Sequence, residues 1–211
     1  MEQSFCASVP LKRLVVVGLG LIGASFAKGI RDAGLASEVV GVDLSSQACE
    51  RAVELGIADR CTTDLAEACV GADVIMLAVP VLALKQLLTQ LAALKLEHTI
   101  ITDAGSVKGH LLAAAQAAFG HLPPLLVLGH PIAGSERSGV EAVNPELFKH
   151  HKVILTPHAD TDPNAVLCVE KLWQDLGADV ESMSVEQHDR VLAATSHLPH
   201  LLAFGLVDSL A

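Results

Sequence analysis

The chain has 211 residues, a formal net charge of −10 and a pI near 5.4. This acidic balance argues against nucleic acid and anionic membrane as partners, because both carry negative charge. Hydrophobic residues make up 51% and charged residues 18% of the chain, a composition that excludes a largely disordered protein. The mean hydropathy of +0.48 predicts that part of the apolar surface faces a partner.

Cysteine usage and the first residues predict a cytoplasmic protein. Five cysteines occur without a C-x-x-C pair, which is typical of reduced thiols that pack in a core. The N-terminal 14 residues have no basic start followed by an apolar run, so we expect no signal peptide. The apolar stretch 81–96 contains two lysines and two glutamines and predicts an amphipathic helix rather than a membrane span.

Strands and helices alternate along the first 130 residues. We expect strands at 11–18, 38–43, 58–61, 72–80, 99–104 and 125–130, and helices at 21–34, 45–56, from 64, at 81–96 and at 106–119. Such alternation produces right-handed βαβ units. The predicted fold class is therefore α/β, with a doubly wound, mostly parallel Rossmann-type sheet.

The remaining third of the chain continues the pattern and then changes it. Strands are expected at 151–158 and 178–183, with a helix at 162–177 that Asp162 caps. From Ser184 onward the pattern is helical up to the last residue. We therefore place a boundary between an α/β unit, 1–183, and the start of a helical region, 184–211.

A glycine motif, GLGLIG, links the first predicted strand to the first predicted helix. Gly18 permits the tight turn, and Gly20 lets the pyrophosphate of a dinucleotide approach the backbone. The helix start at Leu21 and Ile22 offers free N–H groups to the phosphates. The motif in this context predicts a dinucleotide site.

An acidic residue at the end of the second predicted strand completes the fingerprint. Gly23 permits close helix–strand packing, and Asp43 follows it by 20 residues. The Asp43 carboxylate can accept both ribose hydroxyls, and its charge repels a 2′-phosphate. We therefore expect NAD rather than NADP as the cofactor.

Two further strand ends lie at the same edge of the predicted sheet. Val79 and Pro80 follow the fourth strand, and Asp103, Gly105 and Ser106 follow the fifth. Ligands bind at the carboxyl ends of strands in such sheets, so we assign Val79, Pro80, Asp103 and Gly105 to the cofactor site. Ser106 has two compatible roles, as N-cap of the next helix and as a side chain facing the crevice. Asp103 has a structural alternative, which is to fix the turn.

His130 is the preferred acid–base candidate among ten histidines. It follows an apolar predicted strand, at the ligand side of the sheet, and Pro131 restrains it. A neutral imidazole with a pKa near 6.5 is suited to accept a proton. Five histidines near turns or on exposed helix faces are interpreted as solvated: His98, His110, His121, His150 and His151.

His197 and His200 form an H-x-x-H pair on the predicted final helix. Residues i and i+3 share a helix face, so the pair could hold a metal ion. No third ligand stands out in the sequence, and we expect no metal. The alternatives are that the pair lines a substrate pocket or that one ring is a buried structural histidine.

Several segments together resemble the prephenate/arogenate dehydrogenase family. The segments are GLGLIGAS, VD at 42–43, AVP, TDAGSVK, GHPIAGSERSG and TSHLPHLLA. The resemblance covers nearly the whole chain, and GHPIAGSE and SHLPH are far more specific than the glycine motif. It implies an NAD-dependent enzyme of tyrosine biosynthesis that oxidatively decarboxylates prephenate or arogenate.

The resemblance also implies roles for individual residues. His130 is the catalytic base for the ring hydroxyl, and Ser106 lies near that hydroxyl and the nicotinamide. Five further positions match positions of the family that contact the substrate or order its pocket. Ser135 and Glu136 match the pocket mouth, and the final helix contributes Ser196, His197 and His200. The family has a C-terminal helical domain that forms a homodimer and contributes an arginine to the substrate carboxylate, and 184–211 resembles only its beginning.

Two other functions remain open from the residues. One is a different NAD(P)-dependent dehydrogenase of the β-hydroxyacid or imine-reductase type, which lacks the GHPIAGSE and SHLPH pair. The other is a non-catalytic NAD-binding or regulatory fragment, which the short helical region favours and the intact His130 and Ser106 disfavour.

Overall fold

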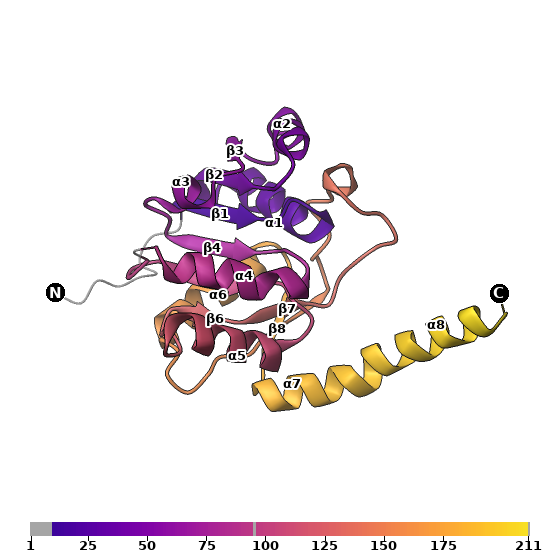
Figure 1. Ribbon diagram of the computed structural model, residues 1–211. Coiled ribbons are helices and arrows are strands. Elements are labelled where there is room, and N and C mark those ends of the chain that lie inside the picture. Colours follow the sequence, from indigo (N-terminus) through magenta and orange to yellow (C-terminus); the bar gives the residue numbers. More distant parts are fainter. Residues whose placement is uncertain (1–9, 95, 211) are drawn as a thin grey trace.

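The computed structural model describes residues 10–94 and 96–210. The expectations for the first residues, for Cys6 and for Lys95 lie outside the described residues. The first part of the chain alternates strands and helices as β1 (Leu11–Val17), α1 (Leu21–Asp32), β2 (Ala36–Val42), α2 (Ser46–Glu54), β3 (Arg60–Thr62), α3 (Leu65–Cys69), β4 (Val74–Leu77), α4 (Val81–Ala92), β5 (Ile100–Asp103), α5 (Lys108–Phe119) and β6 (Leu126–Val127). The alternation confirms the predicted α/β class (Figure 1).

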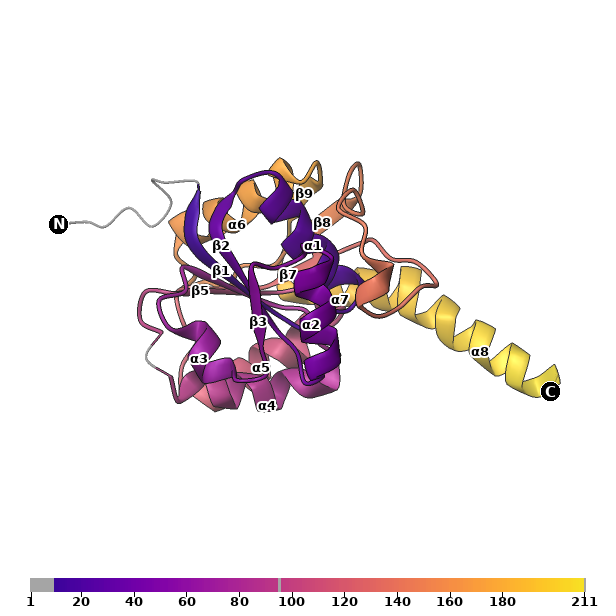
Figure 2. The same ribbon diagram turned by 90° about the horizontal axis from the view of Figure 1, so that it is seen from above.

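Six strands form one parallel sheet in the order β3-β2-β1-β4-β5-β6. The strand order reverses between β1 and β4, the point where ligands bind in doubly wound sheets. Helices cover both faces, with α1 on one face and α4 and α5 on the other (Figure 2). This arrangement confirms the predicted Rossmann-type sheet.

The second part of the chain adds β7 (Gly129–Pro131), a 3-10 turn η1 (Val140–Ala142), β8 (Lys152–Leu155), α6 (Pro163–Asp175) and β9 (Asp179–Ser182). Strands β7 and β8 pair antiparallel, and β8 and β9 pair parallel, in a separate three-stranded sheet. The prediction of one strand at 125–130 is wrong, because the chain passes from one sheet to the other at Leu128. His130 therefore lies inside β7, opposite Ile154.

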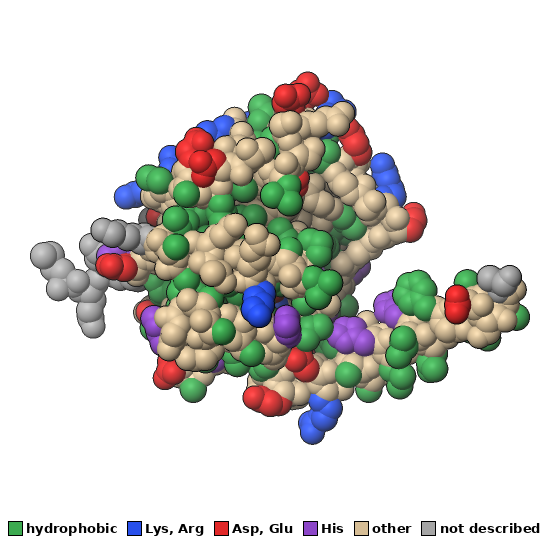
Figure 3. Space-filling view, viewed as in Figure 1, with side chains coloured by type: hydrophobic (Ala, Val, Ile, Leu, Met, Phe, Trp, Pro, Cys, Tyr) green, Lys and Arg blue, Asp and Glu red, His purple; other side chains and the backbone are tan. Residues whose placement is uncertain are grey.

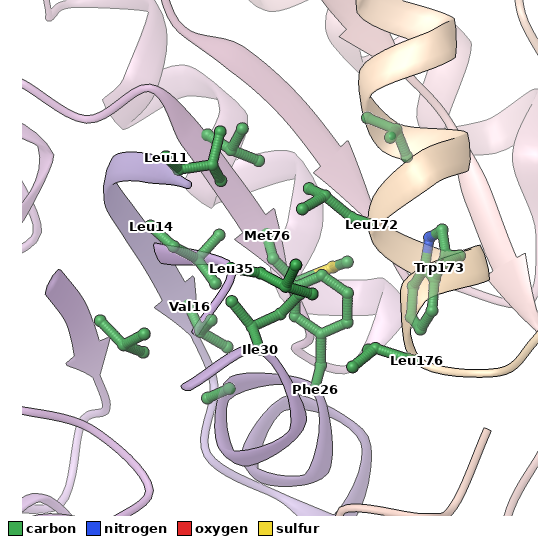
Figure 4. Close-up of a cluster of buried hydrophobic side chains, with 14 of the residues drawn as sticks. Leu11, Leu14, Val16, Phe26, Ile30, Leu35, Met76, Leu172, Trp173 and Leu176 are labelled. Atoms are coloured by element: carbon green, nitrogen blue, oxygen red, sulfur yellow. The ribbon is translucent and has the colours of Figure 1, made fainter. Parts of the chain in front are cut away.

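An aromatic cluster joins α6 to the face of the six-stranded sheet that α1 covers (Figure 4). The rings of Phe26 and Trp173 lie 4.6 Å apart between centroids, and Phe148 packs edge-on against Trp173 at 4.9 Å. All three rings are fully buried. Burial of side chains this large contributes on the order of 1.5–3 kcal/mol each. The three-stranded sheet and α6 are thereby fixed against the body that carries the glycine motif.

The final helix begins as predicted, with the Ser184 hydroxyl accepting from the Gln187 N–H. It runs as α7 (Val185–Leu192), a π-helical turn η2 (Ala193–His197) and α8 (Leu198–Leu210). The first segment contacts α5, whereas α8 projects away from the body (Figure 1). By length and composition alone, Val185–Leu210 is also long and apolar enough to cross a membrane. One such helix is weak evidence for a membrane span, because other apolar helices pass the same test.

The cysteine prediction is wrong for one pair. Cys49 of α2 and Cys61 of β3 form a disulfide, with Cα atoms 5.0 Å apart. Twelve residues separate them in sequence, but α2 packs against β3 and brings the two thiols together. Cys69 and Cys168 are buried, as expected for cysteines that pack in a core.

Candidate active site

A cleft of about 910 Å³ opens at the carboxyl ends of β1, β2 and β4. Five of the predicted cofactor residues line it: Gly18, Gly20, Asp43, Val79 and Pro80. They come from three different strand ends that the sheet order brings together. The cleft therefore lies at the predicted switch point of the sheet.

The three glycines of the motif have distinct geometric roles. Gly18 has a φ of +91°, and a Cβ there would lie 2.5 Å from the Ala78 carbonyl oxygen. A Cβ at Gly23 would lie 1.9 Å from the Gly18 carbonyl oxygen, so this position requires glycine for helix–strand contact. A Cβ at Gly20 would meet nothing within 4 Å. That open space is where a ligand can approach the backbone.

The N-terminus of α1 has unpaired donors at the cleft. Gly20 is the N-cap, without a side-chain capping bond, and the first turn contains no acidic residue. The Leu21 and Ile22 side chains are half-buried against the core, so these two residues offer only backbone N–H groups to a ligand. Free N–H groups at a helix start form an anion-binding position.

Asp43 is held in place by two backbone donors. One carboxylate oxygen accepts from Leu19 N and the other from Ser45 N, each at 3.0 Å. A carboxylate oxygen can accept more than one hydrogen bond, so both oxygens can also receive ribose hydroxyls. The geometry fits the predicted role of Asp43.

Asp103 does not reach the cleft. Its side chain is 1% exposed, and its oxygens accept from Lys108 Nζ at 2.6 Å, Gly105 N at 2.7 Å and Gly129 N at 3.1 Å. The fully buried Lys108 also donates to the Gly129 carbonyl at 2.6 Å. Asp103 therefore fixes the turn after β5, the structural alternative, and its assignment to the cofactor site is corrected; Gly105 is buried in the same turn.

Ser106 does not cap α5. The helix begins at Lys108 and has no side-chain cap from the preceding turn. Instead, the carboxylate of Asp189 in α7 accepts from Lys108 N at 2.9 Å and Gly109 N at 2.8 Å. The capping role predicted for Ser106 is wrong because a distant residue fills it. Ser106 itself is half-buried.

His130 belongs to a chain of three side chains that the sequence did not reveal. Its Nδ1 lies 3.0 Å from Nε2 of His188, and Nδ1 of His188 lies 2.8 Å from an Asp189 carboxylate oxygen. His188 is fully buried, whereas His130 is half-buried. The N–H groups of Lys108 and Gly109 thus share Asp189 with the histidine pair.

The surroundings of His130 keep its ring neutral. Burial lowers its pKa to about 3, and the charges of Lys108, His188 and His197 act in the same direction, against the opposite effect of Asp189. A pKa this low leaves the ring uncharged and able to accept a proton at neutral pH. The pKa near 6.5 assumed from the sequence is that of an isolated histidine.

The other predicted substrate residues differ in their exposure. Ser135 and Glu136 are exposed on the loop after β7, and the Ser135 hydroxyl accepts from Arg137 N at 3.2 Å. Ser196 and His197 are half-buried in η2. His200 is exposed on α8.

Histidine side chains gather where the final helix leaves the body (Figure 3). His197 is close enough for its charge to act on His130. Within residues 10–94 and 96–210, no three His, Cys, Asp or Glu side chains are grouped to hold a metal ion.

Comparison with known proteins identifies one family. The family model described as "Prephenate dehydrogenase, nucleotide-binding domain" matches residues 26–182. The cyclohexadienyl dehydrogenase of Zymomonas mobilis is 38% identical over 197 residues, which cover 93% of this chain and 66% of that protein. Across three curated relatives, the chain spans between about half and two thirds of their length.

Solved structures agree with the sequence match. The crystal structure of A. aeolicus prephenate dehydrogenase in complex with hydroxyphenyl propionate and NAD⁺ superposes with a TM-score of 0.89 at 40% identity, covering 96% of this chain and 70% of the other. The Synechocystis arogenate dehydrogenase gives a TM-score of 0.82 at 31% identity, covering 93% and 68%. The similarity extends through the α/β unit into the final helix.

Proposed function

The chain belongs to the prephenate dehydrogenase family, and we propose that it carries the NAD-binding and proton-accepting parts of an enzyme that oxidatively decarboxylates prephenate or arogenate. The observation that carries this proposal is the pairing of a dinucleotide cleft with a neutral, anchored histidine, His130. The reaction needs both parts, because it moves one hydride and one proton. Such an enzyme serves tyrosine biosynthesis.

The cleft fits NAD by three features of this chain. The α1 start offers N–H groups to the pyrophosphate, Gly20 leaves room for it, and Asp43 offers acceptors to the adenosine ribose. The negative charge of Asp43 disfavours the 2′-phosphate of NADP. When bound, NAD⁺ supplies the hydride acceptor. The family relation and the NAD⁺ in the A. aeolicus complex support this choice.

His130 performs the proton step in this proposal. Hydride leaves the ring carbon that bears the hydroxyl, so the hydroxyl oxygen must lose its proton as a carbonyl forms. Nδ1 of His130 faces His188, which leaves Nε2 to accept that proton. Loss of carbon dioxide then makes the ring aromatic and the reaction irreversible. Such a base contributes roughly 10²–10⁴ in rate.

The remaining polar side chains are proposed to position the substrate. Ser106 would lie near the reacting hydroxyl and the nicotinamide, and Ser135 and Glu136 at the pocket mouth. Ser196 and His197 would face the substrate side chain from η2, and His200, which stands exposed on α8, would order that side of the pocket. The relatives named above include prephenate, cyclohexadienyl and arogenate dehydrogenases, so both substrates remain in the proposal.

Turnover with both substrates tests the function. Absorbance of NADH is followed with prephenate or arogenate, on this chain and on a fusion that adds the C-terminal part of the Zymomonas relative. We expect NADH formation with at least one substrate, faster in the fusion. NAD⁺ binding without turnover in either form would contradict the catalytic proposal and favour a nucleotide-binding fragment.

We also propose that the protein is a cytoplasmic homodimer in which α8 packs against a second copy. Six large apolar side chains of α8 are more than 60% exposed: Leu201, Leu202, Phe204, Leu206, Val207 and Leu210. An apolar face of this kind marks an interaction site, and closed two-fold dimers are the commonest assembly of soluble proteins. The net charge of −10 disfavours an anionic membrane.

Sedimentation in detergent-free buffer tests the dimer. We expect the unmodified chain to sediment as a dimer. The variant Leu202→Glu should dissociate to a monomer, whereas Leu44→Glu, at an exposed position away from α8, should remain a dimer. A monomer at micromolar concentration would contradict the proposal, as would recovery of the protein with membranes after cell fractionation.

A further inference from the structure

We propose that His188 and Asp189 are positioning residues that fix His130 in the tautomer with a hydrogen on Nδ1 and a free lone pair on Nε2. The inference rests on the proposed function, since it assigns the orientation of the base in that reaction. The two residues are neighbours in α7, on the side of the helix that faces His130 and α5.

Asp189 can only accept hydrogen bonds while it is ionised. Burial acts to raise the pKa of Asp189, but the N–H groups of Lys108 and Gly109 and the His188 ring outweigh it, so the pKa lies below the ordinary value. Asp189 is therefore a carboxylate at neutral pH. Nδ1 of His188, 2.8 Å away, must carry the hydrogen of that contact.

The hydrogen on His188 in turn determines the tautomer of His130. Burial lowers the pKa of His188, Lys108 adds to this effect, and Asp189 acts against it. The net shift leaves a neutral ring with a hydrogen on Nδ1, so Nε2 is an acceptor. His130 Nδ1, 3.0 Å away, must then donate to it. A neutral His130 with hydrogen on Nδ1 has its lone pair on Nε2, the nitrogen that accepts the substrate proton.

The arrangement also suits the charge that forms during the reaction. The O–H bond of the substrate breaks and the Nε2–H bond of His130 forms, which makes an imidazolium ion. Its Nδ1–H keeps donating to His188, and the negative charge of Asp189 lies one ring beyond. A carboxylate so placed stabilises the imidazolium without accepting a proton itself.

Asp189 additionally connects the base to the turn that carries Ser106. Its carboxylate accepts from the first two N–H groups of α5, and α5 begins directly after that turn. One carboxylate thus sets the position of both His130 and the β5–α5 turn. A substitution of Asp189 is therefore expected to displace both His130 and the turn that carries Ser106.

Two substitutions at His188 separate orientation from packing. In His188→Asn the amide can still contact Asp189 but is too short for His130, whereas the amide oxygen of His188→Gln can accept from His130 Nδ1. In the form of the enzyme that turns over, we expect kcat to fall about 10- to 100-fold in His188→Asn and to recover partly in His188→Gln. The KM and the NAD⁺ affinity should change less than threefold. Glu186→Gln, on the exposed face of α7, is the control and should match the wild type.

The tautomer itself is measurable without turnover. Nitrogen-15 chemical shifts of the His130 ring at pH 7 should show a protonated Nδ1 and an unprotonated Nε2, and Asp189→Asn or His188→Asn should give a tautomer mixture. A mixture in the wild type, or equal kcat losses in the Asn and Gln variants of His188, would overturn the inference. Absence of turnover in the wild type would contradict the proposed function alone, and the nitrogen shifts would still decide this inference.

Discussion

The two halves of the site are built in opposite ways. The cofactor cleft uses backbone geometry from short segments, since the glycine motif spans six residues and Asp43 directly follows the next strand, β2. The proton-accepting half uses side chains far apart in sequence, with 58 residues between His130 and His188 and 81 between Lys108 and Asp189. The cofactor cleft depends on the open space beside Gly20, and the proton-accepting half depends on a buried network of charged side chains. Substitutions should therefore affect the two halves differently.

The largest expected effect on stability is at the buried ion pair that anchors the second half. Lys108→Met removes the partner of Asp103, whose carboxylate then stays buried without its countercharge. Breaking such a pair costs roughly 3–5 kcal/mol. Chemical denaturation of Lys108→Met should show this loss, and Lys85→Met, at an exposed lysine of α4, should show almost none. Equal stabilities of the two variants would contradict the importance of the pair.

Two glycines of the cleft should separate stability from binding. The Cβ of Gly23→Ala overlaps the Gly18 carbonyl, and relief of such overlap costs about 1–3 kcal/mol. The Cβ of Gly20→Ala meets no protein atom, so stability should hold while NAD⁺ affinity falls. Calorimetric titration and thermal melts of both variants check this. A Gly20→Ala variant that binds NAD⁺ like the wild type would show that the pyrophosphate lies elsewhere.

Cofactor choice should shift by a smaller amount. Asp43→Ser removes the charge that repels a 2′-phosphate, so the affinity for NADP⁺ relative to NAD⁺ should rise about tenfold, or about 1.4 kcal/mol. Asp64→Asn is a matched control, because Asp64 also lines the cleft and asparagine preserves its capping of α3. Both cofactors are titrated calorimetrically. Equal affinities for the two cofactors in the unmodified chain would refute the role of Asp43.

The histidine pair should make the fold acid-sensitive. The pKa of His130 lies below the value of about 6.5 of an unfolded histidine, so the unfolded chain binds more protons between pH 6.5 and about 3. Stability is therefore lost as the pH falls through this window, by less than about 1.4 kcal/mol per pH unit for this half-buried group. Denaturation at pH 7 and pH 5 should show a smaller loss in His130→Asn than in the wild type. The exposed-site variant His151→Asn should behave like the wild type.

Local patterns predicted the first half of the site better than the second. The alternation of strands and helices, the glycine contacts and the start of the final helix at Ser184 follow from spacing within a few residues. Spacing does not reveal that Asp189 supplies the α5 cap that was assigned to Ser106, or that Leu128 ends one sheet before β7 begins another. Spacing also assigns no role to His188, because its partner His130 lies on a strand of the separate sheet. Long-range hydrogen bonds of buried side chains leave no periodic signal in a sequence.

The most direct test of the proton-accepting role is the comparison of turnover and NAD⁺ affinity in His130→Asn. In the form that turns over, kcat should fall by roughly 10²–10⁴, while the NAD⁺ dissociation constant stays within threefold, since the cleft lies on other strands. His110→Asn, at an exposed position of α5, should keep both values. A His130→Asn variant that retains most of its turnover would show that the proton leaves by another route.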